Sequence, residues 1–176
     1  GCGLCASSIP VWEGREWFQY PLAPGAPGHE AWGIIEKVGN HITTLLPGQK
    51  VALLAGNTLS QFCYTTEDLC VLLPEPIQHF PLPGEPLGCA MNIFKRSDIR
   101  KDQDVAIIGA GFLGLLLIQL SKAEGARVTA VSKRKSSLQA ALDAGADFVC
   151  DLATENAESE ISQLTGGKGY DRVIEC

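Results

Sequence analysis

DVAIIGAGFLGLLLIQLSKAEGARVTAVSKR, residues 104–134, is the stretch of this sequence that decides the fold. A short apolar run over residues 105–108 leads into the pattern G-x-G-x-x-G, and a long apolar, helix-forming run follows at once. Gly125 is a typical helix stop, and residues 127–131 then read as a second strand. A strand, a glycine turn, a helix and a second strand in this order predict a unit that binds a dinucleotide.

Each glycine of the turn has its own expected task. Gly109 permits the tight turn from strand to helix, Gly111 lets a pyrophosphate approach the backbone, and Gly114 lets the helix pack closely on the strand. The free N–H groups at the helix start, with the positive end of the helix dipole, would face the phosphates. The alternative is a glycine-rich turn without a ligand. The candidate cofactor-binding residues here are Gly109, Gly111, Phe112, Leu113 and Gly114.

The end of the second strand bears on which dinucleotide binds. An acidic residue there would hold the ribose hydroxyls of NAD, but this chain has Ser132, Lys133 and Arg134. A hydroxyl followed by two cations can hold a ribose 2′-phosphate through charge-assisted hydrogen bonds. We therefore expect NADP more than NAD. The alternative interpretation is a solvated basic turn over residues 133–135.

Composition excludes several classes of function. With 45% hydrophobic residues the 176-residue chain can bury a real core, and its formal net charge of −6 argues against nucleic acid as a partner. No run of 18 apolar residues is present, so we expect no membrane span. Seven cysteines, an odd number without a repeated spacing, favour a reducing compartment, and we expect a cytoplasmic protein. We expect most of these thiols to be buried, namely Cys63, Cys70, Cys89 and Cys150, which stand among apolar residues.

Two halves of different character divide the sequence, and the expected fold class is α/β. Residues 1–91 contain short β-like runs separated by Gly and Pro turns, which predict a β-rich, closed or barrel-like domain. Residues 92–176 alternate strands and helices. The chain has no initiator Met, and three or four strands fit after residue 104, whereas a doubly wound domain has about six. We expect a piece of a longer enzyme that lacks both ends. The predicted elements are strands at 33–38, 50–54, 62–65, 69–73 and 148–150, and helices at 87–96, 136–144 and 157–164.

Possible metal ligands stand in the first half and at its end. Cys5 and the Gly28-His29-Glu30 motif offer a thiolate, an imidazole and a carboxylate, which are the ligand types that zinc accepts, and Glu85 offers a further carboxylate. Spacing alone leaves other interpretations open, because no C-x-x-C pair is present. A buried thiol and a surface turn would give the same pattern.

The motifs in combination resemble a known family. Cys5, Gly-His-Glu, Val-Gly at 38–39, Pro-Gly-Gln-Lys-Val at 47–51, Glu-Pro-Leu at 85–87 and GAGFLG follow one another in the order found in the medium-chain dehydrogenase/reductase family. The chain looks most like the zinc-dependent alcohol and polyol dehydrogenase branch. This resemblance implies a GroES-like catalytic domain over residues 1–91 and a Rossmann cofactor domain over residues 92–176, both truncated.

The resemblance also implies roles for individual residues. Cys5, His29 and Glu30 match zinc ligands, and Glu85 matches a metal-associated carboxylate, with Cys89 as its rival. Ser7 matches the hydroxyl that passes the substrate proton towards solvent, so it is the candidate catalytic residue.

The sequence departs from the family pattern in two places. Ser8 stands where family members usually carry an Asp that orients the zinc-binding histidine, and loss of such a partner typically costs about ten- to a hundredfold in metal affinity or activity. The four-cysteine lobe that holds a second zinc is absent, because Cys63 and Cys70 lack C-x-x-C spacing. We therefore expect one catalytic zinc and no structural zinc.

The resemblance implies a zinc-dependent oxidoreductase, a homo-oligomer, that transfers a hydride between an alcohol or polyol, or its carbonyl product, and a nicotinamide cofactor. Two alternatives stay open. One is a zinc-independent NADPH reductase of quinone or enoyl type from the same superfamily. The other is a non-catalytic dinucleotide-binding protein.

Overall fold

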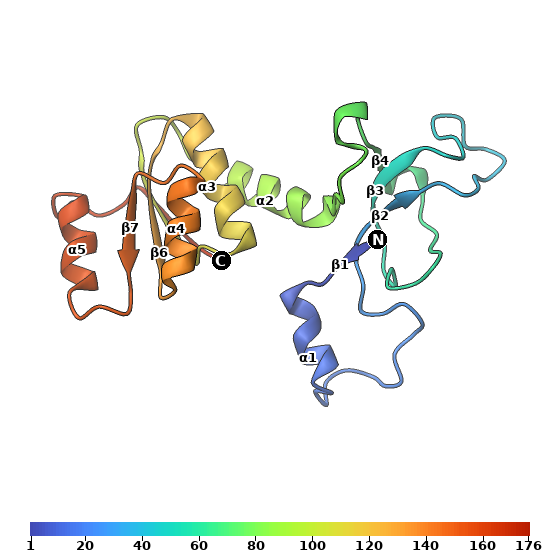
Figure 1. Ribbon diagram of the computed structural model, residues 1–176, viewed down its shortest axis with the longest axis horizontal. Helices are drawn as coiled ribbons and strands as arrows, with labels where there is room; N and C mark the ends of the chain where they lie inside the picture. The colour runs from blue at the N-terminus through green and yellow to red at the C-terminus, as the bar shows by residue number, and fades with distance from the viewer. The chain divides into compact units, whose positions relative to one another are not determined.

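Two four-stranded sheets organise the chain, and the computed structural model describes all 176 residues (Figure 1). Residue contacts divide the chain into a first unit, Gly1–Gly88, and a second unit, Cys89–Cys176, each containing one sheet. The division falls within helix α2 (Gly84–Ser97), which includes the predicted helix at 87–96 and extends it at both ends.

The sheet of the first unit is antiparallel, with its strands in chain order. Alternating buried residues of the two central strands, Ala31, Val51 and Leu53, form a small core. The sheet is open at both edges and is not the closed, barrel-like structure that the sequence predicts. Its elements are β1 (Cys2–Gly3), η1 (Ala6–Ser8), α1 (Ile9–Trp12), β2 (Glu30–Ile34), β3 (Lys50–Leu54), η2 (Glu67–Leu69), β4 (Cys70–Leu72) and η3 (Glu75–Ile77).

Some strand predictions for this unit are wrong. The strand predicted at 33–38 begins at Glu30 and ends at Ile34, and residues 62–65 form no strand. Strand β3 pairs with β2 and β4, and residues 62–65 pair with neither of the edge strands β1 and β4. Cys63 in that segment is exposed, as is Cys89 on α2, so the expectation that these thiols are buried is also wrong.

The second unit is a parallel sheet with strand order β7-β6-β5-β8. In this order β5 is an inner strand, with β6 and β7 on one side of it and β8 on the other. The strands that follow β5 in the sequence are therefore added first on one side of it and then on the other. The predicted α/β pattern of strand and helix is confirmed. Its elements are β5 (Asp104–Ile108), α3 (Phe112–Glu124), β6 (Arg127–Ser132), α4 (Lys135–Asp143), β7 (Phe148–Asp151), α5 (Ala157–Leu164) and β8 (Arg172–Glu175).

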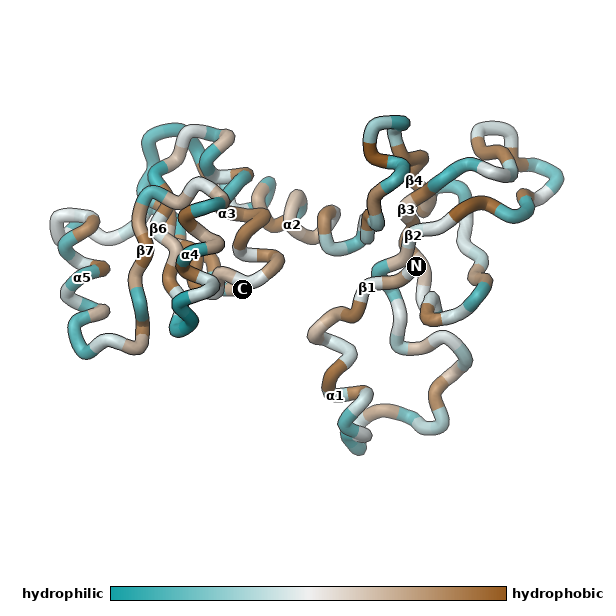
Figure 2. Tube along the Cα trace, in the orientation of Figure 1, coloured by the Kyte–Doolittle hydropathy of each residue, from teal (hydrophilic) through white to brown (hydrophobic).

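The core of the second unit lies between the central strands and helix α3. Val105 and Ile107 of β5, Val128 of β6, and Leu117 and Ile118 of α3 are completely buried. Figure 2 shows the hydropathy of each residue along the chain: α5 is mostly hydrophilic, whereas β6 and β7 carry hydrophobic residues. Continuous apolar strands of this kind are typical of parallel sheets covered on their faces. None of the helices has the length and apolar character needed to span a membrane.

Candidate metal and nucleotide sites

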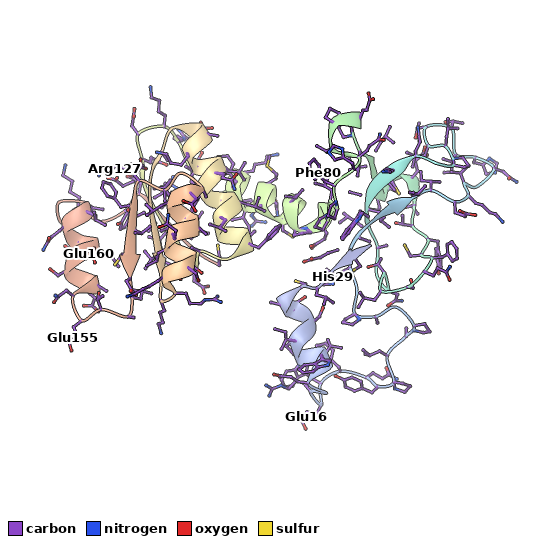
Figure 3. The ribbon with its side chains drawn as sticks, viewed as in Figure 1. Glu16, His29, Phe80, Arg127, Glu155 and Glu160 are labelled. Atoms are coloured by element: carbon purple, nitrogen blue, oxygen red, sulfur yellow. The ribbon has the colours of Figure 1, made fainter.

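Strand pairing brings the distant metal motifs together. Strand β1 pairs antiparallel with β2, with Gly3 opposite Glu30. Cys5 follows the end of β1 and His29 precedes the start of β2, so the two residues lie at the same end of this strand pair. His29, labelled in Figure 3, lies beside β1.

Three possible ligand atoms converge at this end of the sheet. The Cys5 sulfur, a ring nitrogen of His29 and a carboxylate oxygen of Glu30 all lie within 4.8 Å of one another, and each residue is partly buried. Gly3 makes room for this arrangement, because a Cβ there would collide with the Glu30 carboxylate. Sulfur, imidazole nitrogen and carboxylate oxygen form a donor set that suits zinc, and three protein ligands leave a position open for a substrate. The residues present therefore fit a catalytic zinc ion.

The His29 ring is held by two neighbours. Its Nδ1 lies 3.0 Å from the carbonyl oxygen of Pro27 and donates a hydrogen bond to it when protonated. The pKa of His29 is raised by this hydrogen bond and by one to Cys5, although partial burial opposes the shift, and the negative charges of Cys5 and Glu85 add to it. With Nδ1 turned to Pro27, the Nε2 atom is the ring nitrogen free for a metal.

The other residues expected near the metal take different places. Glu85 lies in the first turn of α2, outside the group of three, although its charge acts on His29. Its rival Cys89 is exposed one turn further along the helix. Ser7 is exposed on the η1 turn that follows Cys5. Ser8 donates its backbone N–H to the Cys5 carbonyl at 3.0 Å, and its hydroxyl makes no hydrogen bond to His29.

The glycine turn has the geometry expected of a dinucleotide site. Gly109 has φ of +101°, a conformation that favours glycine, and a Cβ there would collide with the carbonyl oxygen of Cys176. Gly114 is buried in the first turn of α3, and a Cβ on it would collide with the carbonyl oxygen of Gly109. Gly114 therefore lets α3 start close to β5, and Gly109 lets the turn lie against the residue that follows β8.

Gly111 has a different environment. It is the N-cap of α3, and a Cβ there would meet nothing within 4 Å, so open space faces the start of the helix. The first turn of α3 carries no acidic side chain that would repel a phosphate. Phe112 is exposed at the helix start, while Leu113 packs against the core and offers only its backbone. The residues present fit the pyrophosphate of a dinucleotide.

The basic segment lies at the carboxyl end of β6. Ser132 is the last residue of the strand, and its hydroxyl accepts the backbone N–H of Arg134 at 3.3 Å. Lys133 and Arg134 are exposed. Sequence reasoning missed Asp151, which the sheet places opposite Ser132 and whose carboxylate accepts the Ala153 N–H at 2.9 Å. No signal in the sequence assigns these two strands to neighbouring places, so only the sheet order reveals this carboxylate.

Comparisons with known proteins agree with these observations. Residues 1–89 match the family described as alcohol dehydrogenase GroES-like domain, and residues 113–176 match the family described as zinc-binding dehydrogenase. The chain is similar to D-xylulose reductase A of Aspergillus oryzae, at 31% identity over 210 residues, covering 99% of this chain and 59% of that protein. It therefore spans less than two thirds of the length of this relative. The alignment is longer than this chain, so the relative carries residues inside it that have no counterpart here.

Solved structures show the same architecture. The chain superposes on galactitol-1-phosphate dehydrogenase of Escherichia coli with a TM-score of 0.81 at 24% identity, covering 99% of this chain and 58% of that one. It superposes on the alcohol dehydrogenase TADH of Thermus sp. ATN1 with a TM-score of 0.78 at 22% identity, covering 99% and 61%. These likenesses confirm a GroES-like unit followed by a Rossmann-type unit. Together with the two family matches, they place this chain in the zinc-type medium-chain dehydrogenase/reductase family.

Proposed function

We propose that the protein is a zinc- and nicotinamide-dependent dehydrogenase that interconverts a polyol or related alcohol and its carbonyl product. The observation that carries this proposal is the convergence of the Cys5, His29 and Glu30 donor atoms within 4.8 Å of one another. A D-xylulose reductase and a galactitol-1-phosphate dehydrogenase among the similar proteins support the polyol class. By the family resemblance we also propose a homo-oligomer, and from the cysteine content a cytoplasmic location.

The proposed roles follow from the places of the residues. Cys5, His29 and Glu30 hold the metal, and Glu85 adds negative charge beside His29. The exposed Ser7, two residues after Cys5, receives the substrate proton and passes it to solvent. The turn from Gly109 to Gly114 holds the pyrophosphate. When bound, zinc supplies Lewis acidity at the substrate oxygen and the nicotinamide accepts or donates the hydride.

The two alternative functions are less well supported. A zinc-independent reductase has no use for a thiol, an imidazole and a carboxylate brought together, and a non-catalytic protein has none either. Ser8, which stands where the family usually has Asp, is the one sequence feature that favours a non-catalytic protein. The hydrogen bond from His29 to Pro27 weakens that argument, because it orients the ring without a residue at position 8.

Elemental analysis and activity of the purified protein test the proposal together. We expect one zinc per chain, and we expect removal of zinc by a chelator to abolish NADP-dependent oxidation of polyols while the dinucleotide still binds. Return of activity on adding zinc back serves as the control. A folded protein that contains no zinc and yet reduces a quinone or an enoyl substrate would contradict the proposal. Two zinc ions per chain would contradict the expectation of a single, catalytic zinc.

A separate prediction concerns the choice of cofactor, for which we propose NADP. The double variant Lys133→Ala/Arg134→Ala removes two exposed cations beside Ser132. We expect it to weaken NADP binding by about ten- to a hundredfold. Charge-assisted hydrogen bonds contribute about 1.5–3 kcal/mol each, and solvent lowers the contribution of exposed side chains such as these two. NAD binding should change much less. Fluorescence titration with NADPH and NADH measures both, and equal losses would contradict the choice of NADP.

The neighbouring Lys135→Ala variant is the matched control. Lys135 is also exposed, but it is the first residue of helix α4 and lies further from the end of β6 than Lys133 and Arg134 do. We expect the ratio of NADP to NAD affinity to stay near that of the wild type in this variant.

A further inference from the structure

The Pro27 carbonyl is the one hydrogen-bond acceptor that holds His29 from outside the group of three donors. It lies 3.0 Å from Nδ1, and the ring is otherwise bonded to Cys5. A backbone carbonyl is a fixed acceptor only where the backbone that carries it is itself fixed. The turn that contains Pro27 must therefore be fixed if its carbonyl is to orient the His29 ring.

Residues 57–59 hold this turn at both of its ends through backbone hydrogen bonds. The Leu59 N–H donates to the Gly25 carbonyl at 2.9 Å, and the Thr58 N–H donates to the Gly28 carbonyl at 3.1 Å. Inside the turn the Gly28 N–H donates to the Gly25 carbonyl at 3.1 Å. Three backbone hydrogen bonds thus fix the two ends of the turn, with Pro27 between them.

Residues 57–59 also contact β1, the strand that precedes Cys5. Thr58 is 5% exposed, and its hydroxyl lies 3.1 Å from the sulfur of Cys2 in β1. Asn57 adopts φ of +59°, and its carbonyl oxygen lies against Gly25. The contact is so close that a Cβ on Gly28 would lie 2.5 Å from the Leu59 nitrogen, and a Cβ on Gly25 would collide with the Asn57 carbonyl.

We propose that the turn over residues 25–28, held by residues 57–59, is the device that orients His29 for the metal, through the Pro27 carbonyl as acceptor of Nδ1–H. It is a positioning element, since none of its atoms belongs to the donor group. The inference rests on the proposed zinc site. It also assigns a function to the two glycines of the turn, because only residues without a Cβ allow the segments to approach this closely.

The first test is direct and needs no variant. The protein contains three histidines, so nitrogen-15 NMR of the zinc-loaded protein can resolve the His29 ring. We expect a protonated Nδ1 in slow exchange with water and a metal-bound Nε2. A protonated Nε2 with Nδ1 on the metal would overturn the proposal.

The second test displaces the turn without touching a ligand. Gly25→Ala places a methyl group against Asn57, and we expect zinc affinity, measured by competition with a chelator, to fall about tenfold or more. The matched control is Gly48→Ala. Gly48 has φ of +88° against +85° for Gly25, but nothing lies within 4 Å of its Cβ position, so the backbone strain is alike and the collision is absent. We expect the control to bind zinc within about twofold of the wild type.

The outcomes separate this inference from the proposed function. Wild-type protein that binds no zinc would overturn both. Zinc bound by the wild type, with equal affinity in Gly25→Ala and Gly48→Ala, would overturn the positioning role alone. The visible spectrum of the cobalt-substituted proteins adds a readout of ligand geometry, which we expect to change in Gly25→Ala only. If Gly25→Ala does not fold, the protonation of His29 in the wild type decides the matter.

Discussion

Cys5→Ser and His29→Ala should each remove zinc and abolish turnover. Each substitution removes a donor atom from the group in which the sulfur, nitrogen and carboxylate oxygen lie within 4.8 Å. Loss of a mere outer partner costs about ten- to a hundredfold in metal affinity or activity, so loss of a ligand should cost more. Zinc content, measured by elemental analysis, and the rate of polyol oxidation provide the two readouts.

Dinucleotide binding should survive both substitutions. The glycine turn lies in the second unit, whose core is its own and contains neither residue. Cys63→Ser is the matched control, because Cys63 is an exposed thiol of the first unit outside the donor group. It should keep full zinc content and activity. Full activity in Cys5→Ser would show that the metal mechanism is wrong.

Gly114→Ala should have the second large effect, a loss of both stability and dinucleotide binding. The added methyl group would collide with the Gly109 carbonyl, which is backbone and cannot rotate away, so α3 must move from β5. Overpacking of this kind typically lowers the free energy of unfolding by about 1–3 kcal/mol. Because the start of α3 would shift with respect to the turn, we expect affinity for NADPH to fall by about a hundredfold, the equivalent of about 2.7 kcal/mol.

Gly111→Ala separates binding from folding. Its φ of −91° suits any residue, and its Cβ position is open, so the midpoint of thermal unfolding should stay close to that of the wild type. The methyl group would nevertheless stand where a pyrophosphate approaches the backbone, and we expect weaker NADPH binding in a stable protein. Thermal unfolding and fluorescence titration measure the two effects. Unchanged affinity in Gly111→Ala would contradict the proposed place of the phosphates.

Much of the second unit could be predicted because its signals are local. Strand β5, the glycine turn and α3 follow one another directly, and Gly114 makes its close contact with the Gly109 carbonyl only five residues earlier in the chain. Predictions for the first unit were less accurate. Residues 62–65 have the composition of a strand, yet they pair with neither β1 nor β4, the two strands at the open edges of the sheet. Strand formation requires backbone pairing with a particular neighbouring strand, which composition does not specify.

The sequence by itself determined the chemistry of this protein: a thiol, an imidazole and a carboxylate of the type that zinc binds, and a glycine turn that opens a helix towards phosphates. Only the tertiary structure decided how these groups meet. Pairing of β1 with β2 brings Cys5 to His29 and Glu30. The hydrogen bonds from residues 57–59 hold the turn whose Pro27 carbonyl faces the His29 ring. The order of the parallel strands places Asp151 opposite Ser132. These contacts join residues far apart in the chain, and their formation depends on strand pairing and turn packing that no local pattern encodes.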